Sequence, residues 1–291
     1  MANGIIIIDK PEGWTSMDVC AKLRGVFHEK RIGHGGTLDP MATGVLPVFV
    51  GRATRAVEFA TESRKEYIAG IKLGVVTNTQ DTSGEILEEH PVSVAREQLP
   101  NLLERFTGDL EQLPPMYSAI KIKGKKLYEL ARKGQEVERK PRSIHIYALE
   151  LLGKSTSGDP LLRVECSKGT YVRTLCHDLG QALGCGACMS ALRRTRAAGF
   201  SLEDAVSLEQ VLTAEDPIAL LRPVDCFFAR SGWKGSLTVR PAAEKVLRNG
   251  GQAPTSEADG EWRVYSQSGE FLGLGSSQGA CLRLIKSFFE V

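Results

Sequence analysis

A single acidic side chain, Asp39, lies in a stretch rich in glycine and proline. Residues 31–47 read RIGHGGTLDPMATGVLP, with four glycines, two prolines and no second carboxylate. Glycine permits backbone conformations closed to other residues, and Pro40 fixes its own φ directly after the acid. Since Asp before proline is also common in plain turns, two interpretations stay open. Asp39 either forms a turn or is presented to a substrate as a nucleophile or base.

Other patterns that could support chemistry lack the partners that such chemistry requires. Cys185 and Cys188 form one CxxC, but a zinc site needs further Cys or His ligands at matching spacing. His34 and Asp39 could form a metal pair, but no further ligands stand nearby at the required spacing. The DTSG at 81–84 resembles an aspartic-protease triplet, which acts only with a second triplet. The glycines of 273–279 follow an expected hairpin and open no helix, unlike a dinucleotide loop. We therefore expect structural cysteines and no metal.

The positive charge is concentrated in one segment. The formal net charge is only +2, yet residues 121–142 hold nine Lys and Arg against three Glu, with Tyr128 among them. The rest of the chain is therefore slightly acidic. Such a segment is either a solvated face or a contact for a polyanion, and basic side chains next to an aromatic ring suit nucleic acid.

Composition sets the class of protein. A length of 291 residues suggests about two domains, and 42% hydrophobic residues suffice for a core. The four isoleucines 5–8 are too few for a signal or membrane segment. Seven scattered cysteines, an odd number, suit reduced thiols better than a disulfide framework. We expect a soluble cytoplasmic protein.

The elements that must position these residues follow from local patterns. The patterns predict strands and helices without a regular alternation, so the expected class is α+β with a largely antiparallel sheet flanked by helices. A catalytic domain is expected at 1–225 and a small β-rich domain at 226–291. The expected strands are Gly4–Asp9, 65–75, 143–153 and 160–167. The expected helices run from a Thr15–Asp18 capping box to about His28, over 93–106, from a Thr170 cap to Gly184, and from Pro241 to Gly250.

Several stretches together resemble the TruB family of tRNA pseudouridine synthases. The resemblance spans about residues 4–200, and the C-terminal part is more weakly similar to the PUA-like RNA-binding domain of that family. It is carried by these stretches: GIIIIDKPEGWTS, GHGGTLDPMATGVLPVFVGRATR, KEYIAGIKLG, TNTQDTSGEI, PPMYSAIKIKGKKLYELARKG and CSKGTYVRTLCHDLGQALGCGA.

The resemblance implies an enzyme that converts uridine 55 in the T-loop of tRNA to pseudouridine, on a pseudouridine-synthase-like fold. It places the catalytic aspartate at Asp39, supported by Arg173, and a base-stacking tyrosine at Tyr67. The implied substrate-binding residues are His34, Tyr171, Leu192 and Lys10. The basic insertion at about 121–142 would grip the RNA backbone, through Lys121, Lys123, Lys125, Lys126, Arg132 and Lys133.

The implied reaction breaks the C1′–N1 bond and rejoins the base through C5, so no cofactor or metal is expected. The carboxylate must be ionised, and a guanidinium beside it favours the charged form. Whether it attacks the sugar, adds to the base or removes a sugar proton stays open.

Two alternative functions remain: a non-catalytic RNA-binding protein on this scaffold, and a guide-dependent relative of the dyskerin kind. We expect a stand-alone enzyme, a monomer that acts on the T-arm of tRNA without an obligatory protein partner. Cys188 and His177 depart from the pattern and receive no role.

Overall fold

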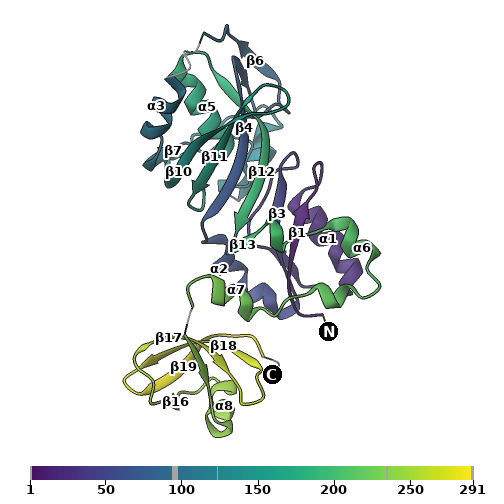
Figure 1. Cartoon of the computed structure of the whole chain (residues 1–291), viewed down its shortest axis with the longest axis vertical. Coiled ribbons are helices and arrows are strands. Elements are labelled where there is room, and N and C mark those ends of the chain that lie inside the picture. Colours follow the sequence, from purple (N-terminus) through teal and green to yellow (C-terminus); the bar gives the residue numbers. More distant parts are fainter. Residues whose placement is uncertain (1, 94–97, 123, 234, 290–291) are drawn as a thin grey trace. The chain divides into compact units, whose positions relative to one another are not determined.

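The computed structural model describes residues 2–93, 98–122, 124–233 and 235–289 (Figure 1). The chain divides into two compact units, each assembled from separate stretches. Unit 1 comprises residues 1–39, 45–63 and 197–291, and unit 2 comprises residues 40–44 and 64–196. The predicted division at residue 225 is a different one and stays a prediction.

Unit 1 is built on a strand that is buried on both faces. In β1 (Gly4–Lys10), Ile5 and Ile7 enter one apolar cluster while Ile6 and Ile8 enter another. Successive side chains of a strand point to opposite faces, so the isoleucine run lies in the middle of the unit rather than at its surface. The strand order is β14–β1–β3, with β2 paired antiparallel to β3. These partners are β2 (Ile32–His34), β3 (Thr43–Val50) and β14 (Val206–Ser207).

Short helices complete unit 1 around these strands. Helix α1 (Ser16–Phe27) begins with the predicted capping box of Thr15 and Asp18 and ends at His28 in the left-handed conformation, which confirms both predicted ends. Its residues Val19, Leu23 and Phe27 pack into the cluster that holds Ile6 and Ile8. Further helices of unit 1 are α2 (Val57–Thr61), α6 (Leu208–Thr213) and α7 (Asp225–Arg230).

The C-terminal part of the chain forms its own sheet, as predicted. Its strands follow the order β15–β17–β18–β19–β16, and α8 (Pro241–Arg248) begins with proline and is followed by Gly250. The side chains of Val264, Leu272 and Leu282 form its core. The strands are β15 (Ser236–Thr238), β16 (Ala253–Pro254), β17 (Gly260–Tyr265), β18 (Phe271–Gln278) and β19 (Cys281–Ser287).

Unit 2 is a largely antiparallel sheet in the order β12–β4–β11–β10–β7. Residues Thr43 and Gly44 add a short parallel pairing to β12 at Arg193 and Arg194. The sheet is therefore mixed, which together with the helices confirms the α+β class. Its strands are β4 (Lys65–Leu73), β7 (Gly108–Gln112), β10 (Arg142–Lys154), β11 (Pro160–Cys166) and β12 (Ala187–Ala197).

Two helices pack on this sheet. Helix α5 (Val172–Leu183) contacts β4, while α3 (Gln98–Arg105) contacts β10 and α5 (Figure 1). Of the helix predicted over 93–106, the part at Gln98–Arg105 is helical, and residues 94–97 lie outside the described residues. The predicted Thr170 cap is wrong: Tyr171 precedes the helix, and the Thr170 hydroxyl donates to the Ser167 carbonyl instead. Gly184 ends α5 in the left-handed conformation, as predicted.

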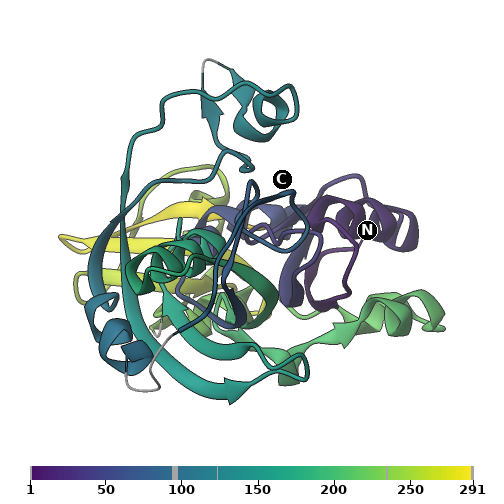
Figure 2. The ribbon, with the colours of Figure 1, turned by 90° about the horizontal axis from the view of Figure 1, so that it is seen from above.

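Two long connections join the basic insertion to the sheet of unit 2. Residues 113–120 and 132–141 form neither helix nor strand, and between them lie a hairpin and one short helix, which Figure 2 shows in teal at the top. The elements are β8 (Lys121–Ile122), β9 (Lys125–Lys126) and α4 (Leu127–Ala131). Within the described stretches, no helix is long and apolar enough to cross a membrane.

Candidate functional site

The guanidinium of Arg173 is buried and held from several sides. Arg173 lies in the first turn of α5 and is 5% exposed. Its Nη1 donates to the Thr79 carbonyl at 2.9 Å, and its Nη2 donates to the Tyr117 carbonyl at 2.8 Å. Backbone carbonyls thus replace water around the cation and set the direction of its planar group.

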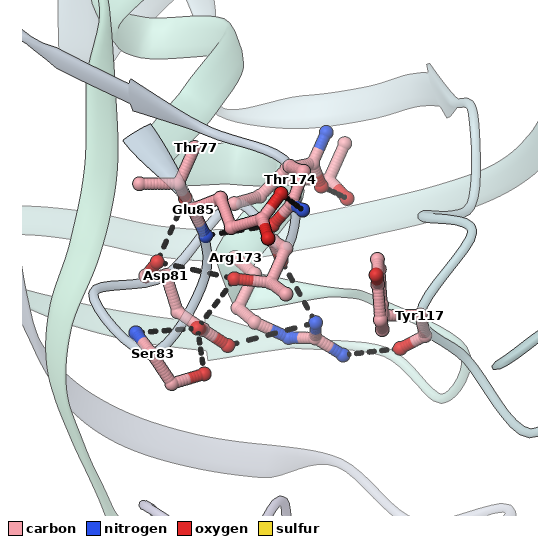
Figure 3. Close-up of polar contacts among 10 residues, drawn as sticks. Thr77, Asp81, Ser83, Glu85, Tyr117, Arg173 and Thr174 are labelled. Atoms are coloured by element: carbon pink, nitrogen blue, oxygen red, sulfur yellow. Dashed lines mark hydrogen bonds and ion pairs between the residues drawn. The ribbon is translucent and has the colours of Figure 1, made fainter. Parts of the chain in front are cut away.

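Asp81 supplies the counter-charge to this cation. Asp81 Oδ2 lies 3.6 Å from Arg173 Nη1, and both side chains are about 5% exposed (Figure 3). The other oxygen, Oδ1, accepts hydrogen bonds from the Ser83 amide, the Ser83 hydroxyl and the Thr79 hydroxyl. Three hydrogen bonds to Oδ1 and the Arg173 guanidinium beside Oδ2 hold the Asp81 carboxylate in one orientation within unit 2.

The loop that carries Asp81 is itself tied to two neighbouring elements. The Thr82 amide donates to the Met189 carbonyl on β12, and the Met189 amide donates to the Gln80 carbonyl. The Thr174 hydroxyl of α5 donates to Gln80 Oε1 at 2.7 Å. Gly84 is needed here, because a Cβ on it would lie 2.3 Å from Thr79 Oγ1. The loop therefore holds one conformation between β5 (Val75–Thr77) and β6 (Ile86–Glu89).

A second contact fixes the start of α5. The side-chain amide of Gln112, buried on β7, donates to the Tyr171 carbonyl at 3.1 Å and accepts from the Tyr171 amide at 2.8 Å. Both polar backbone groups of Tyr171 are thereby satisfied by one side chain. Because Arg173 follows two residues later, the same contact also holds the turn from which the guanidinium extends.

Neither Asp81 nor Gln112 received a role from the sequence. Asp81 lies in TNTQDTSGEI, one of the stretches that carry the family resemblance, and Gln112 lies two residues before another, which begins PPMYSAI. The signal that could have singled out Asp81 is a lone acid in a turn of small polar residues, whose hydroxyls can donate to a carboxylate.

Unit 2 also contains three of the predicted substrate-binding residues. Tyr67 lies on β4 opposite Val164 and is 7% exposed. Leu192 lies on β12 and is buried, and Tyr171 is half-buried. Together with Arg173 these residues belong to β4, β12 and the N-terminal end of α5. Their predicted roles toward a substrate remain predictions.

The remaining predicted residues of the site belong to unit 1. Asp39 is half-buried in the loop between β2 and β3, and His34 on β2 pairs with Val48. Lys10 is fully buried, and its Nζ donates to the carbonyls of Pro11 and Trp14 at 2.9 and 2.6 Å. Those bonds shape the turn after β1. The predicted pairing of Asp39 with Arg173 stays a prediction.

The basic insertion presents its cations beside an aromatic ring. Lys126 Nζ donates to the Tyr128 hydroxyl at 3.2 Å, and the Arg132 guanidinium lies 5.5 Å from the centre of the Tyr128 ring. The bond to Tyr128 raises the pKa of Lys126, so this cation stays charged. Lys121, Lys125, Arg132 and Lys133 are exposed. Lys123, predicted as an RNA contact, lies outside the described residues.

Within the described residues, no group of three or more His, Cys, Asp or Glu is arranged to hold a metal ion. Cys185 and Cys188 are buried and unbridged, and burial raises the pKa of the Cys188 thiol. A buried thiol with a raised pKa fits the structural role expected for Cys188.

Comparison with known families gives two adjacent matches. Residues 24–172 match the family model described as "TruB family pseudouridylate synthase (N terminal domain)". Residues 173–227 match the model described as "tRNA pseudouridylate synthase B C-terminal domain".

Individual relatives match almost the whole chain. A protein named tRNA pseudouridine synthase B from Stutzerimonas stutzeri is 46% identical over 297 residues, which covers 98% of this chain and 96% of the relative. The protein of that name from Azoarcus sp. is 43% identical over 97% of this chain and 94% of its own length.

Among solved structures, a chain of the "Cbf5-Nop10-Gar1 Complex" aligns with a TM-score of 0.73 and 26% identity. That alignment covers 98% of this chain and 85% of the other. A chain of an H/ACA RNP bound to a substrate RNA has a TM-score of 0.72 at 24% identity, which shows the shared fold.

The buried ion pair predicts strong energetic coupling between Asp81 and Arg173. Asp81→Asn keeps an acceptor for Ser83 and Thr79 but removes the charge, and Arg173→Met removes the cation. Each change alone leaves the other side chain buried without that counter-charge. Removing one member of a buried ion pair lowers the free energy of unfolding by about 3–5 kcal/mol. In a double-mutant cycle of urea unfolding we expect a coupling energy of at least about 1 kcal/mol.

The more exposed pair Arg163–Glu66, 2.8 Å apart in the same unit, is the matched control. The cycle of Arg163→Met with Glu66→Gln should give a smaller coupling energy, because water screens a pair that it can reach. Additive effects of Asp81→Asn and Arg173→Met would contradict the assignment of Asp81 as the counter-ion.

Proposed function

Because this chain belongs to the TruB family of pseudouridylate synthases, we propose that it isomerises a uridine of tRNA to pseudouridine, at position 55 in the T-loop. The observation that carries this proposal is the identity of 46% to a tRNA pseudouridine synthase B over 98% of the chain. The proposed compartment is the cytoplasm, where the seven free cysteines would remain reduced.

The chemistry of the proposed reaction needs few groups. The C1′–N1 bond of the uridine breaks, the base turns, and a C1′–C5 bond forms. The proton on C5 is lost and N1 gains a proton, so atoms and electrons balance without an oxidant or an added group. A single carboxylate that stays ionised can serve the reaction as nucleophile or base.

In this proposal Asp39 is that carboxylate and Arg173 is the cation that supports it. A guanidinium has five N–H donors, so a single guanidinium can bind the Thr79 and Tyr117 carbonyls and also orient a carboxylate. A carboxylate beside a fixed cation keeps its charge when a base displaces water from it. The rigid surroundings of Arg173 would hold that cation in place during the reaction.

The target base must leave its stack before it can react. Extrusion costs a few kcal/mol, and an aromatic side chain returns about 1–3 kcal/mol by stacking. Tyr67 is the proposed stacking surface, with His34, Tyr171, Leu192 and Lys10 as further members of the substrate site. The exposed cations of the basic insertion are proposed to bind the RNA backbone, and the C-terminal sheet is proposed as a PUA-like RNA-binding region.

The experiment that tests the function uses purified protein and a T-arm transcript labelled with tritium at C5 of uridine. We expect tritium release without guide RNA, partner protein or added metal, as a stand-alone monomer would give. A transcript with cytidine at position 55 should release none. Release that requires a guide RNA would favour the alternative of a guide-dependent enzyme. That alternative is considered because a chain of the Cbf5-Nop10-Gar1 complex has a similar fold. Binding of tRNA without any release would favour a non-catalytic RNA-binding protein.

The stacking role predicts the behaviour of a Tyr67→Leu variant. Loss of about 1–3 kcal/mol of stacking at the extruded base lowers the single-turnover rate roughly 5- to 150-fold. Affinity for tRNA should change by less than about twofold, because the RNA backbone supplies most of the binding energy. Rapid quench and filter binding measure the two quantities.

Tyr147→Leu makes the same change on β10 of the same sheet, where the Arg64 guanidinium lies over the Tyr147 ring at 3.7 Å. This control should keep the wild-type rate. If Tyr67→Leu is as fast as Tyr147→Leu, Tyr67 is a core residue only.

A further inference from the structure

One hydroxyl group holds both polar backbone groups of the residue before Asp39. Leu38 lies in neither helix nor strand, and its side chain is 3% exposed. Its amide donates to Ser16 Oγ at 2.8 Å, and the same Oγ donates to the Leu38 carbonyl at 3.3 Å. Ser16 and Leu38 are 22 residues apart in the sequence and belong to the same unit.

The hydroxyl is anchored independently of the loop. Ser16 is the first residue of α1 and is 1% exposed. The capping box of Thr15 and Asp18 fixes the start of that helix, with the Thr15 hydroxyl accepting from the Asp18 amide and the Asp18 carboxylate accepting from the Thr15 amide. The place of the Ser16 hydroxyl is therefore set by the helix, and the loop conforms to it.

This contact acts on the backbone that carries Asp39. The carbonyl of Leu38 belongs to the planar peptide group that also contains the Asp39 nitrogen, while the Leu38 amide belongs to the peptide group before it. Holding both groups fixes two consecutive peptide planes, and the second plane ends at the Cα of Asp39. Pro40 restricts the backbone on the other side, because the residue before proline avoids the helical region.

We propose that Ser16 is a positioning residue, whose hydroxyl holds the Leu38 peptide so that the Asp39 carboxylate meets the uridine in one geometry. This inference rests on the proposed role of Asp39. Ser16 touches no reacting atom and acts only through the backbone of Leu38. Small displacements matter for such a group, since a misplacement of about 1 Å can cost roughly 100-fold in rate.

A second serine of unit 1 provides a matched control. The Ser63 hydroxyl donates to the Ala60 carbonyl at 2.7 Å and accepts from the Ala198 amide at 3.1 Å. It makes the same two kinds of bond as Ser16, but neither partner adjoins a proposed site residue. Loss of either hydroxyl leaves backbone groups without these bonds, so both variants should lower the temperature of unfolding.

The test compares Ser16→Ala with Ser63→Ala on the T-arm transcript. For Ser16→Ala we expect a single-turnover rate lowered roughly 10- to 100-fold, with tRNA affinity within about twofold of wild type. Ser63→Ala should keep the wild-type rate at a similar loss of thermal stability. A wild-type rate for Ser16→Ala, or an equal loss of rate in both variants, would overturn the proposal.

A pair of larger variants covers the case in which Ser16→Ala does not fold. Ser16→Thr and Ser16→Val add nearly the same bulk and differ in the presence of a hydroxyl. We expect the threonine variant to be at least roughly tenfold faster than the valine variant, and equal rates would refute the role of the hydroxyl.

Asp39→Asn, measured beside them, separates this inference from the proposed function. Full activity of Asp39→Asn would refute the proposed catalytic role of that carboxylate. An inactive Asp39→Asn together with a fully active Ser16→Ala would remove only the role of Ser16.

Discussion

Backbone N–H and C=O groups that are buried outside helices and strands still need hydrogen-bond partners, and side chains meet this requirement in the loops next to Asp39 and Arg173. Ser16 meets it for Leu38, and Gln112 meets it for Tyr171. In each case one side chain from a regular element binds both polar groups of one loop residue. The loops next to Asp39 and Arg173 are thereby as fixed as the helix and strand that hold them.

Charge places a second requirement on unit 2. A buried guanidinium is costly unless a counter-charge and hydrogen-bond acceptors surround it, and Arg173 has both in Asp81 and two carbonyls. The donors around Asp81 in turn come from the small residues of its own turn. A cation that is fixed before substrate arrives needs no reorganisation when a neighbouring carboxylate reacts, which is the advantage of a preorganised site.

Local patterns in the sequence predicted the elements whose signal lies within a few residues. The predicted strands that form β1 and β4 and the predicted capping box of α1 were confirmed, because burial and capping depend on neighbours in the chain. Contacts between distant residues were not predictable in this way. Asp81 was considered only as part of a protease triplet, and Gln112 and Ser16 bind partners 59 and 22 residues away. Thr170 is not the cap because the helix begins one residue later, after Tyr171, and the Thr170 hydroxyl donates to the Ser167 carbonyl.

In the proposed reaction one carboxylate, that of Asp39 on its fixed loop, carries the isomerisation. The most direct test is the single-turnover rate of pseudouridine formation by Asp39→Asn on a T-arm transcript, measured together with its affinity for that RNA. An amide of the same shape cannot act as the nucleophile or base, so we expect no detectable pseudouridine from Asp39→Asn. Because the shape is kept, we expect its affinity for the T-arm transcript to lie within about twofold of wild type. Pseudouridine formed by Asp39→Asn at the wild-type rate would contradict the proposed role of the carboxylate.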